Sequence, residues 1–154
     1  MKTGLKIYTS FVSPMTLKMV ISNNLLPVFI LRSIHNSELI GKWSGSAVHL
    51  PELSPSVELF RAKRDGLIGK EEFDKKYVIE ISRINLVKTL KTLETLVKVS
   101  GAAGVVLMGY GSDKDLCHRG TLINIFNDSG FLWNPVKEIV VWVGKIERRD
   151  FKKM

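Results

Sequence analysis

Cysteine is nearly absent from this chain, which has a single one, Cys117, in 154 residues. One thiol excludes an internal disulfide framework and a cysteine-rich zinc site. The three histidines, His35, His49 and His118, lack the helical or hairpin spacing of a metal site. The chain also lacks a Gly-Lys-Ser/Thr phosphate loop, the third glycine of a dinucleotide fingerprint and a Gly-x-Ser-x-Gly elbow. We therefore expect no metal and no cofactor.

Long apolar runs are missing as well. The longest, residues 25–31 and 105–108, are far shorter than the roughly 18 residues that a membrane span needs. The N-terminus has no apolar segment of the kind found in secretory signals. Hydrophobic residues make up 45% and charged residues 25% of the chain, as in ordinary soluble globular proteins. We expect a cytoplasmic protein that has no membrane partner.

Acidic residues are the minority charge, since 15 Asp and Glu face 23 Lys and Arg and leave a net charge of +8. A basic surface attracts anions, including nucleic acid. The positive charge is spread along the chain, with only a modest concentration in residues 145–153. This dispersion favours a role in solubility, and nucleic acid stays open as an alternative partner.

Four short segments rich in β-branched and aromatic residues are predicted strands. They are residues 6–10, 26–33, 105–110 and 139–143. The second and third are apolar throughout, which is typical of strands buried on both faces of a parallel sheet. Residues 34–53, with several glycines and serines, are predicted to be irregular.

Helical segments alternate with these strands. They are residues 14–23, a stretch from Ser54 to about residue 65, and residues 70–83, 86–100 and 120–127. Ser13 and Ser54, each followed by proline, are the expected caps of the first two. Phe73, Tyr77 and Ile81 lie four residues apart and predict one buried stripe on the third helix. The fourth is expected to begin after an asparagine cap, Asn85, and to end at Gly101.

This alternation predicts a single α/β domain over residues 1–147, followed by a basic tail over residues 148–154. We expect a mostly parallel sheet of about four or five strands flanked by helices, in a Rossmann-like three-layer arrangement.

The segment from residue 104 to residue 120 carries the strongest functional signal, because a buried strand there leads through a polar loop into a helix. It presents Cys117, His118 and Arg119 at the helix start, beyond the carboxyl end of the strand, where open α/β sheets bind ligands. The helix dipole and the guanidinium both favour a thiolate at Cys117, while Arg119 and the first helical amides suit a phosphate or carboxylate. Each residue also has a purely structural interpretation. Free cysteines are usually buried and inert, His118 can cap the helix or contact a backbone carbonyl, and Arg119 can pair with Asp113 or Asp115.

Other candidates for the same crevice come from the ends of the strands and from the long loop. Tyr8, Thr9 and Ser10 end the first strand, and capping of the strand edge explains them equally well. Arg32 ends the second strand and is a second possible anion clamp. Trp43 fits either a lid that stacks on a planar ligand or a side chain packed onto the domain. The full set of predicted ligand-binding residues is Tyr8, Ser10, Arg32, Trp43, Tyr110, Asp115, His118 and Arg119.

Three functions are compatible with this set. The first is binding of a small anionic ligand, nucleotide-like or phosphorylated, at the strand ends. The second is a cysteine-dependent enzyme with Cys117 as the nucleophile, tuned by His118 or Asp115. Adjacent side chains at a helix start diverge, so His118 is poorly placed as the base for Cys117. The third is a nucleic-acid-binding module that uses the basic surface, although the chain has no recognition helix rich in Arg, Asn and Gln.

The stretch VVLMGYGSDKDLCHRG, together with KIYTS, VFILRS and ELSPSVELF in the same order, resembles the uncharacterised DUF488 family. That family has a hydrophobic strand, an acidic loop and a Cys-His-Arg signature that opens the last helices. The resemblance covers most of residues 5–130, and Gly109 stands where many members carry cysteine. It implies an α/β fold and a site at Cys117-His118-Arg119, without an established reaction.

Overall fold

The computed structural model describes residues 2–31, 47–109 and 118–138, and the structural statements below concern these residues. A five-stranded sheet forms the centre, with strand order β3-β2-β4-β1-β5 and parallel pairing throughout. The strands are β1 (Ile7–Phe11), β2 (Leu25–Phe29), β3 (Val48–His49), β4 (Gly104–Gly109) and β5 (Lys137–Glu138). The predicted α/β class with a parallel Rossmann-like sheet is confirmed.

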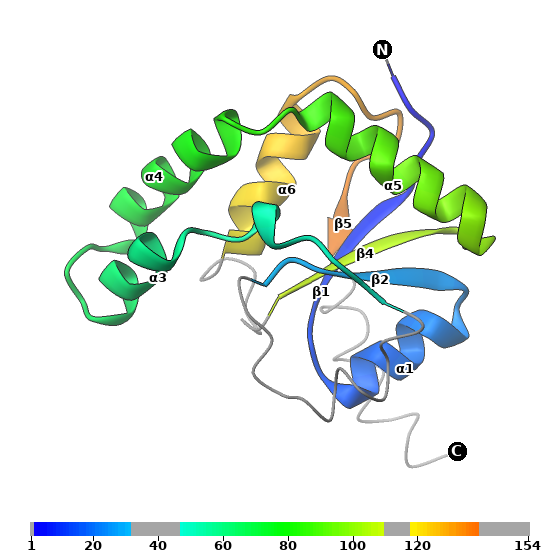
Figure 1. Ribbon diagram of the computed structural model, residues 1–154, viewed down its shortest axis with the longest axis horizontal. Coiled ribbons are helices and arrows are strands. Elements are labelled where there is room, and N and C mark those ends of the chain that lie inside the picture. The colour runs from blue at the N-terminus through cyan, green and yellow to red at the C-terminus, as the bar shows by residue number, and fades with distance from the viewer. Residues whose placement is uncertain (1, 32–46, 110–117, 139–154) are drawn as a thin grey trace.

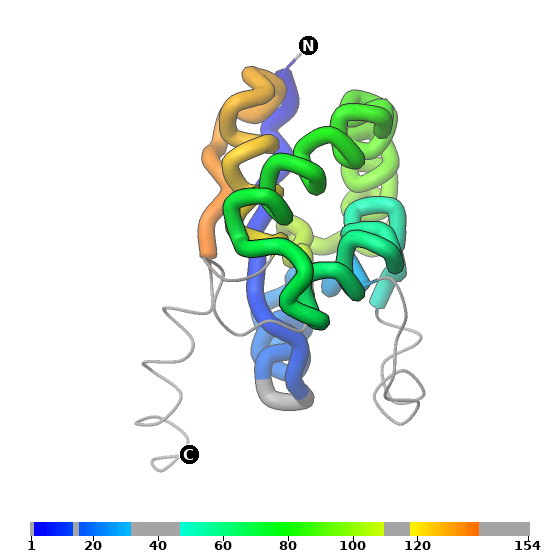
Figure 2. Tube along the Cα trace, turned by 90° about the vertical axis from the view of Figure 1, so that its left-hand side faces the viewer, coloured from blue at the N-terminus to red at the C-terminus, as the bar shows by residue number. Residues whose placement is uncertain are grey.

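Helices lie on both faces of this sheet. They are α1 (Pro14–Ser22), α3 (Val57–Arg64), α4 (Lys70–Ser82), α5 (Leu86–Ser100) and α6 (His118–Asp128), with a short 3-10 turn at Pro51–Leu53. Figure 1 shows α1 on one side of the sheet and the other four helices on the opposite side, and the rotated view in Figure 2 agrees. Within the described residues, no helix is both long and apolar enough to cross a membrane.

The central strands β2 and β4 are buried on both faces because each alternates between two hydrophobic cores. In β4, Val105 and Leu107 pack into the larger core under α4, α5 and α6, whereas Val106 and Met108 pack into the smaller core under α1. All four side chains are fully buried. The predicted apolar strands are thus confirmed, with β4 running in parallel between β2 and β1.

Capping residues and a glycine set the limits of α1 and α5. Ser13 caps α1 in a capping box with Thr16, and Asn85 caps α5 by accepting a hydrogen bond from the Lys88 amide at 3.1 Å. Gly101 ends α5 with a positive φ of 73°, a conformation that glycine adopts without strain. The predicted stripe on α4 is fully buried.

Two local predictions were wrong. The cap of α3 is Ser56 rather than Ser54, because Ser54 is buried beside Leu53, whose carbonyl accepts the Tyr77 hydroxyl at 2.5 Å. Residues 48–53 are not irregular, since they form β3 and the 3-10 turn. The predicted strand over residues 139–143 and the tail over residues 148–154 lie outside the described residues.

Candidate functional site

Strand β1 directs three polar side chains, at its second to fourth positions, to the two faces of the sheet. Tyr8 packs against the smaller core on the α1 side, and Ser10, two residues on, shares that face. Thr9 points to the opposite face, toward α6, and both Thr9 and Ser10 are fully buried. The centre of β1 therefore carries polar groups beside the apolar strand β4.

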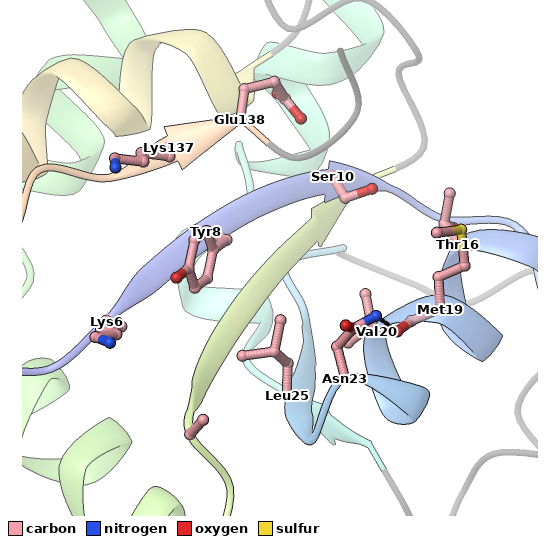
Figure 3. A pocket seen from close by; sticks show the side chains of 11 residues that line it. Lys6, Tyr8, Ser10, Thr16, Met19, Val20, Asn23, Leu25, Lys137 and Glu138 are labelled. Atoms are coloured by element: carbon pink, nitrogen blue, oxygen red, sulfur yellow. Dashed lines mark hydrogen bonds between the residues drawn. The ribbon is translucent and has the colours of Figure 1, made fainter. Parts of the chain in front are cut away.

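A cavity of about 430 Å³ opens on the α1 side of β1. This volume falls in the range of small-molecule sites, about 300–1,000 Å³. Figure 3 shows the side chains that line it, with β1 and β5 on one side and α1 across from them. Among the described residues these are Lys6, Tyr8, Ser10, Thr16, Met19, Val20, Asn23, Leu25, Ala103, Lys137 and Glu138.

Arg119 is fully buried at the start of α6, and its charge is matched by a carboxylate. Its Nη1 lies 2.5 Å from Oε2 of Glu138, whose side chain is only 7% exposed. The Thr9 hydroxyl donates to the same Oε2 at 2.9 Å. Glu138 also lines the cavity, so this buried network and the cavity meet at one residue of the edge strand β5.

A hydrogen bond from His118 connects the start of α6 to Ile30, the residue after β2. Its Nε2 lies 3.0 Å from the carbonyl oxygen of Ile30, and its ring makes an edge-on contact with Tyr77, with centroids 5.6 Å apart. Burial lowers the pKa of His118 from 6.5 to about 4, helped by the charges of Arg119 and Lys63 and opposed by the bond to Ile30. The ring is therefore neutral at pH 7 and donates to that carbonyl.

Gly109, at the end of β4, lies directly under the first two residues of α6. A Cβ atom at this position would be 3.4 Å from Cε1 of His118 and 3.4 Å from Cγ of Arg119. These are ordinary van der Waals distances, so a Cβ atom at residue 109 is sterically compatible with this packing.

The structure brings only part of the predicted site together. Tyr8 and Ser10 line the cavity, and Arg119 reaches its edge through Glu138. His118 instead faces β2 and Tyr77. The other predicted residues, Arg32, Trp43, Tyr110, Asp115 and the candidate nucleophile Cys117, lie outside the described residues.

Sequence reasoning missed three residues of this region: Lys6, Lys137 and Glu138. Lys6 is the first residue of a predicted strand, which placed it near the site but gave no reason to single it out. Lys137 and Glu138 precede the apolar run at residues 139–143, and the only available signal was a carboxylate at the start of a strand.

A protein-family model, DUF488-N3a, described as the active DUF488-N3 subclade, matches residues 30–130, well over half of the chain. Comparisons with curated proteins and with solved structures give no match. The matched range contains the Cys-His-Arg signature at residues 117–119. It does not contain β5, which supplies Glu138 to Arg119, or β1, which supplies Thr9 to Glu138. On this evidence, the chain belongs to the DUF488 family.

Proposed function

We propose that the protein binds a small anionic ligand, nucleotide-like or phosphorylated, in the cavity on the α1 side of β1. The observation that carries this proposal is the lining of the cavity, which combines the aromatic ring of Tyr8 with Lys6 and Lys137 along the α1-side face of β1.

The anionic part of the ligand is assigned to the two lysines. Lys6 precedes β1, and Lys137 pairs in register with Tyr8 of β1, so the two ammonium groups belong to neighbouring strands. Both residues are exposed. Two cations on one cavity favour a phosphate, and the net charge of +8 adds long-range attraction.

The planar part of the ligand is assigned to Tyr8. Its ring is half-buried, and it lies in the cavity between the residues of β5 and those of α1 (Figure 3). An aromatic face of this kind stacks on a nucleobase whatever its identity, because every base has a π-face. The ring thus supports a nucleotide-like ligand over a simple inorganic anion.

Isothermal titration with ribonucleoside 5′-monophosphates and with ribose 5-phosphate tests this proposal. We expect saturable binding that weakens roughly tenfold in Tyr8→Ala, because base stacking contributes about 1–3 kcal/mol. Tyr8→Phe keeps the ring and should bind like the wild type. Ribose 5-phosphate, which lacks a base, should be insensitive to Tyr8→Ala.

A double variant, Lys6→Ala with Lys137→Ala, tests the anion-binding part. We expect weaker binding and a smaller dependence on ionic strength. Lys98→Ala is the matched control, since Lys98 is exposed on α5 and does not line the cavity. Absence of saturable binding, or equal binding by the double variant and the control, would refute the proposal.

A further inference from the structure

Asn23 lines the cavity on the side opposite to Lys137. In the strand order, β1 with Tyr8 lies between β5, which carries Lys137, and β4, which is followed by β2. Asn23 ends α1 two residues before β2, so it lies beyond Tyr8 as seen from Lys137. In the view of Figure 3, the ring of Tyr8 likewise lies between the two lysines and Asn23. A ligand that has its phosphate at the lysines and its base on Tyr8 therefore extends toward Asn23.

The side-chain amide of Asn23 is oriented by a hydrogen bond to the end of α1. Its Nδ2 lies 2.7 Å from the carbonyl oxygen of Met19. A carbonyl oxygen only accepts hydrogen bonds, so the amide atom beside it is the nitrogen. Figure 3 shows Nδ2 turned toward Met19 and Oδ1 on the side of the amide nearer to Tyr8. Among the described residues, this Oδ1 has no hydrogen-bond partner, so it is an acceptor available to a ligand in the cavity.

The end of α1 strengthens the acceptor character of this side of the cavity. The carboxyl end of a helix carries a partial negative charge, equivalent to roughly half an elementary charge. Helix α1 has nine residues and no basic residue in its last turn, so no side chain of that turn compensates this charge. A phosphate is therefore disfavoured beside Asn23, and the group that suits this side of the cavity is a hydrogen-bond donor.

We infer that Asn23 selects nucleotides of adenine or cytosine, whose exocyclic amino group donates a hydrogen bond to its Oδ1. This inference rests on the proposed function, in which Tyr8 stacks on the base and the lysines bind the phosphate. Adenine and cytosine present amino groups at N6 and N4, whereas guanine and thymine present the carbonyl oxygens O6 and O4 at the equivalent positions. A carbonyl oxygen there would face the Asn23 oxygen as acceptor against acceptor. The amide thus discriminates between bases that Tyr8 alone accepts equally.

Isothermal titration with adenosine 5′-monophosphate and with purine riboside 5′-monophosphate tests this inference. The second nucleotide has a hydrogen atom in place of the amino group and otherwise the same structure. We expect the wild type to prefer the adenosine nucleotide by roughly fivefold, the factor that corresponds to one ordinary hydrogen bond. In Asn23→Ala this preference should fall to near equality, because the adenosine nucleotide loses its acceptor. A ratio of two affinities is insensitive to a uniform loss of folded protein.

Ser22→Ala is the matched control. Ser22 is the exposed neighbour of Asn23, and its hydroxyl also bonds to a carbonyl of α1, that of Lys18, but it does not line the cavity. This variant should keep the wild-type preference. Equal binding of the two nucleotides by the wild type, or a preference that survives in Asn23→Ala, would overturn the inference, while saturable binding that depends on Tyr8 would leave the proposed function standing. Absence of binding by both nucleotides would instead refute the proposed function, and this inference with it.

Discussion

His118 offers a sharp test of how the buried start of α6 contributes to stability. Its neutral imidazole donates to the Ile30 carbonyl, and burial lowers its pKa from 6.5 to about 4. The substitution His118→Gln places an amide nitrogen near the position of Nε2, so it retains a donor and removes the titrating group. The two proteins should therefore differ in the pH dependence of their stability.

The direction follows from proton binding. Between pH 6.5 and pH 4 the unfolded chain protonates His118 while the folded protein does not, so the free energy of unfolding decreases as the pH falls. The contribution is fully present above pH 6.5 and is lost as the pH falls toward 4. At about 1.4 kcal/mol for each pKa unit, the whole effect is about 3 kcal/mol, and about 2 kcal/mol is already lost at pH 5.

Urea denaturation of both proteins at pH 7 and pH 5 measures this effect. Carboxylates and other groups titrate in both proteins, so subtracting the variant from the wild type isolates His118. We expect the stability advantage of the wild type over His118→Gln to shrink by about 2 kcal/mol between the two pH values. An advantage that stays constant would show that the folded protein accepts the proton at His118 as readily as the unfolded chain does.

Further substitutions test the packing and the caps, each by urea denaturation at pH 7. Gly104→Ala should lower the free energy of unfolding by about 1–3 kcal/mol, because its Cβ would lie 2.6 Å from a backbone carbonyl oxygen. Gly109→Ala should change stability by less than about 1 kcal/mol, since its nearest neighbours lie at 3.4 Å, and equal costs for the two glycines would contradict this contact analysis. Tyr77→Phe should cost about 1–2 kcal/mol, because a buried carbonyl loses its hydroxyl donor, and a neutral result would argue against that bond. Asn85→Ala should cost about 1 kcal/mol by removing the cap of α5, whereas Asn85→Asp, which can also cap, should not.

Local patterns predicted most of the fold. The spacing of Phe73, Tyr77 and Ile81 identified α4, and the asparagine cap and the glycine at the ends of α5 fixed its limits. Such signals act within one or two helical turns, so the sequence displays them directly. The strand β3 has two residues, which is too short for any alternation to be visible. The cap of α3 was misplaced because its position depends on burial of Leu53 and Ser54 under α4, a contact between distant segments.

The candidate site was predicted only in part for the same reason. Arg119 was identified from its place at a helix start, but its partner Glu138 comes from another strand, and Thr9 is 129 residues away from that partner. No periodicity connects residues so far apart. The predicted direct contact of Arg119 with an anion stays a prediction, and the structure adds a protein carboxylate beside its guanidinium.

The position of β1 between β4 and β5 has a consequence for folding during synthesis on the ribosome. Residues 7–11 are synthesised well before their partners, residues 105–109 and 137–138. Translation adds roughly 5–20 residues per second, so on the order of ten seconds pass between the synthesis of β1 and that of β4, its first neighbour along the chain. The sheet therefore closes late, and its completion should be governed by the formation of these distant pairings rather than by the rapid local folding of α4 and α5.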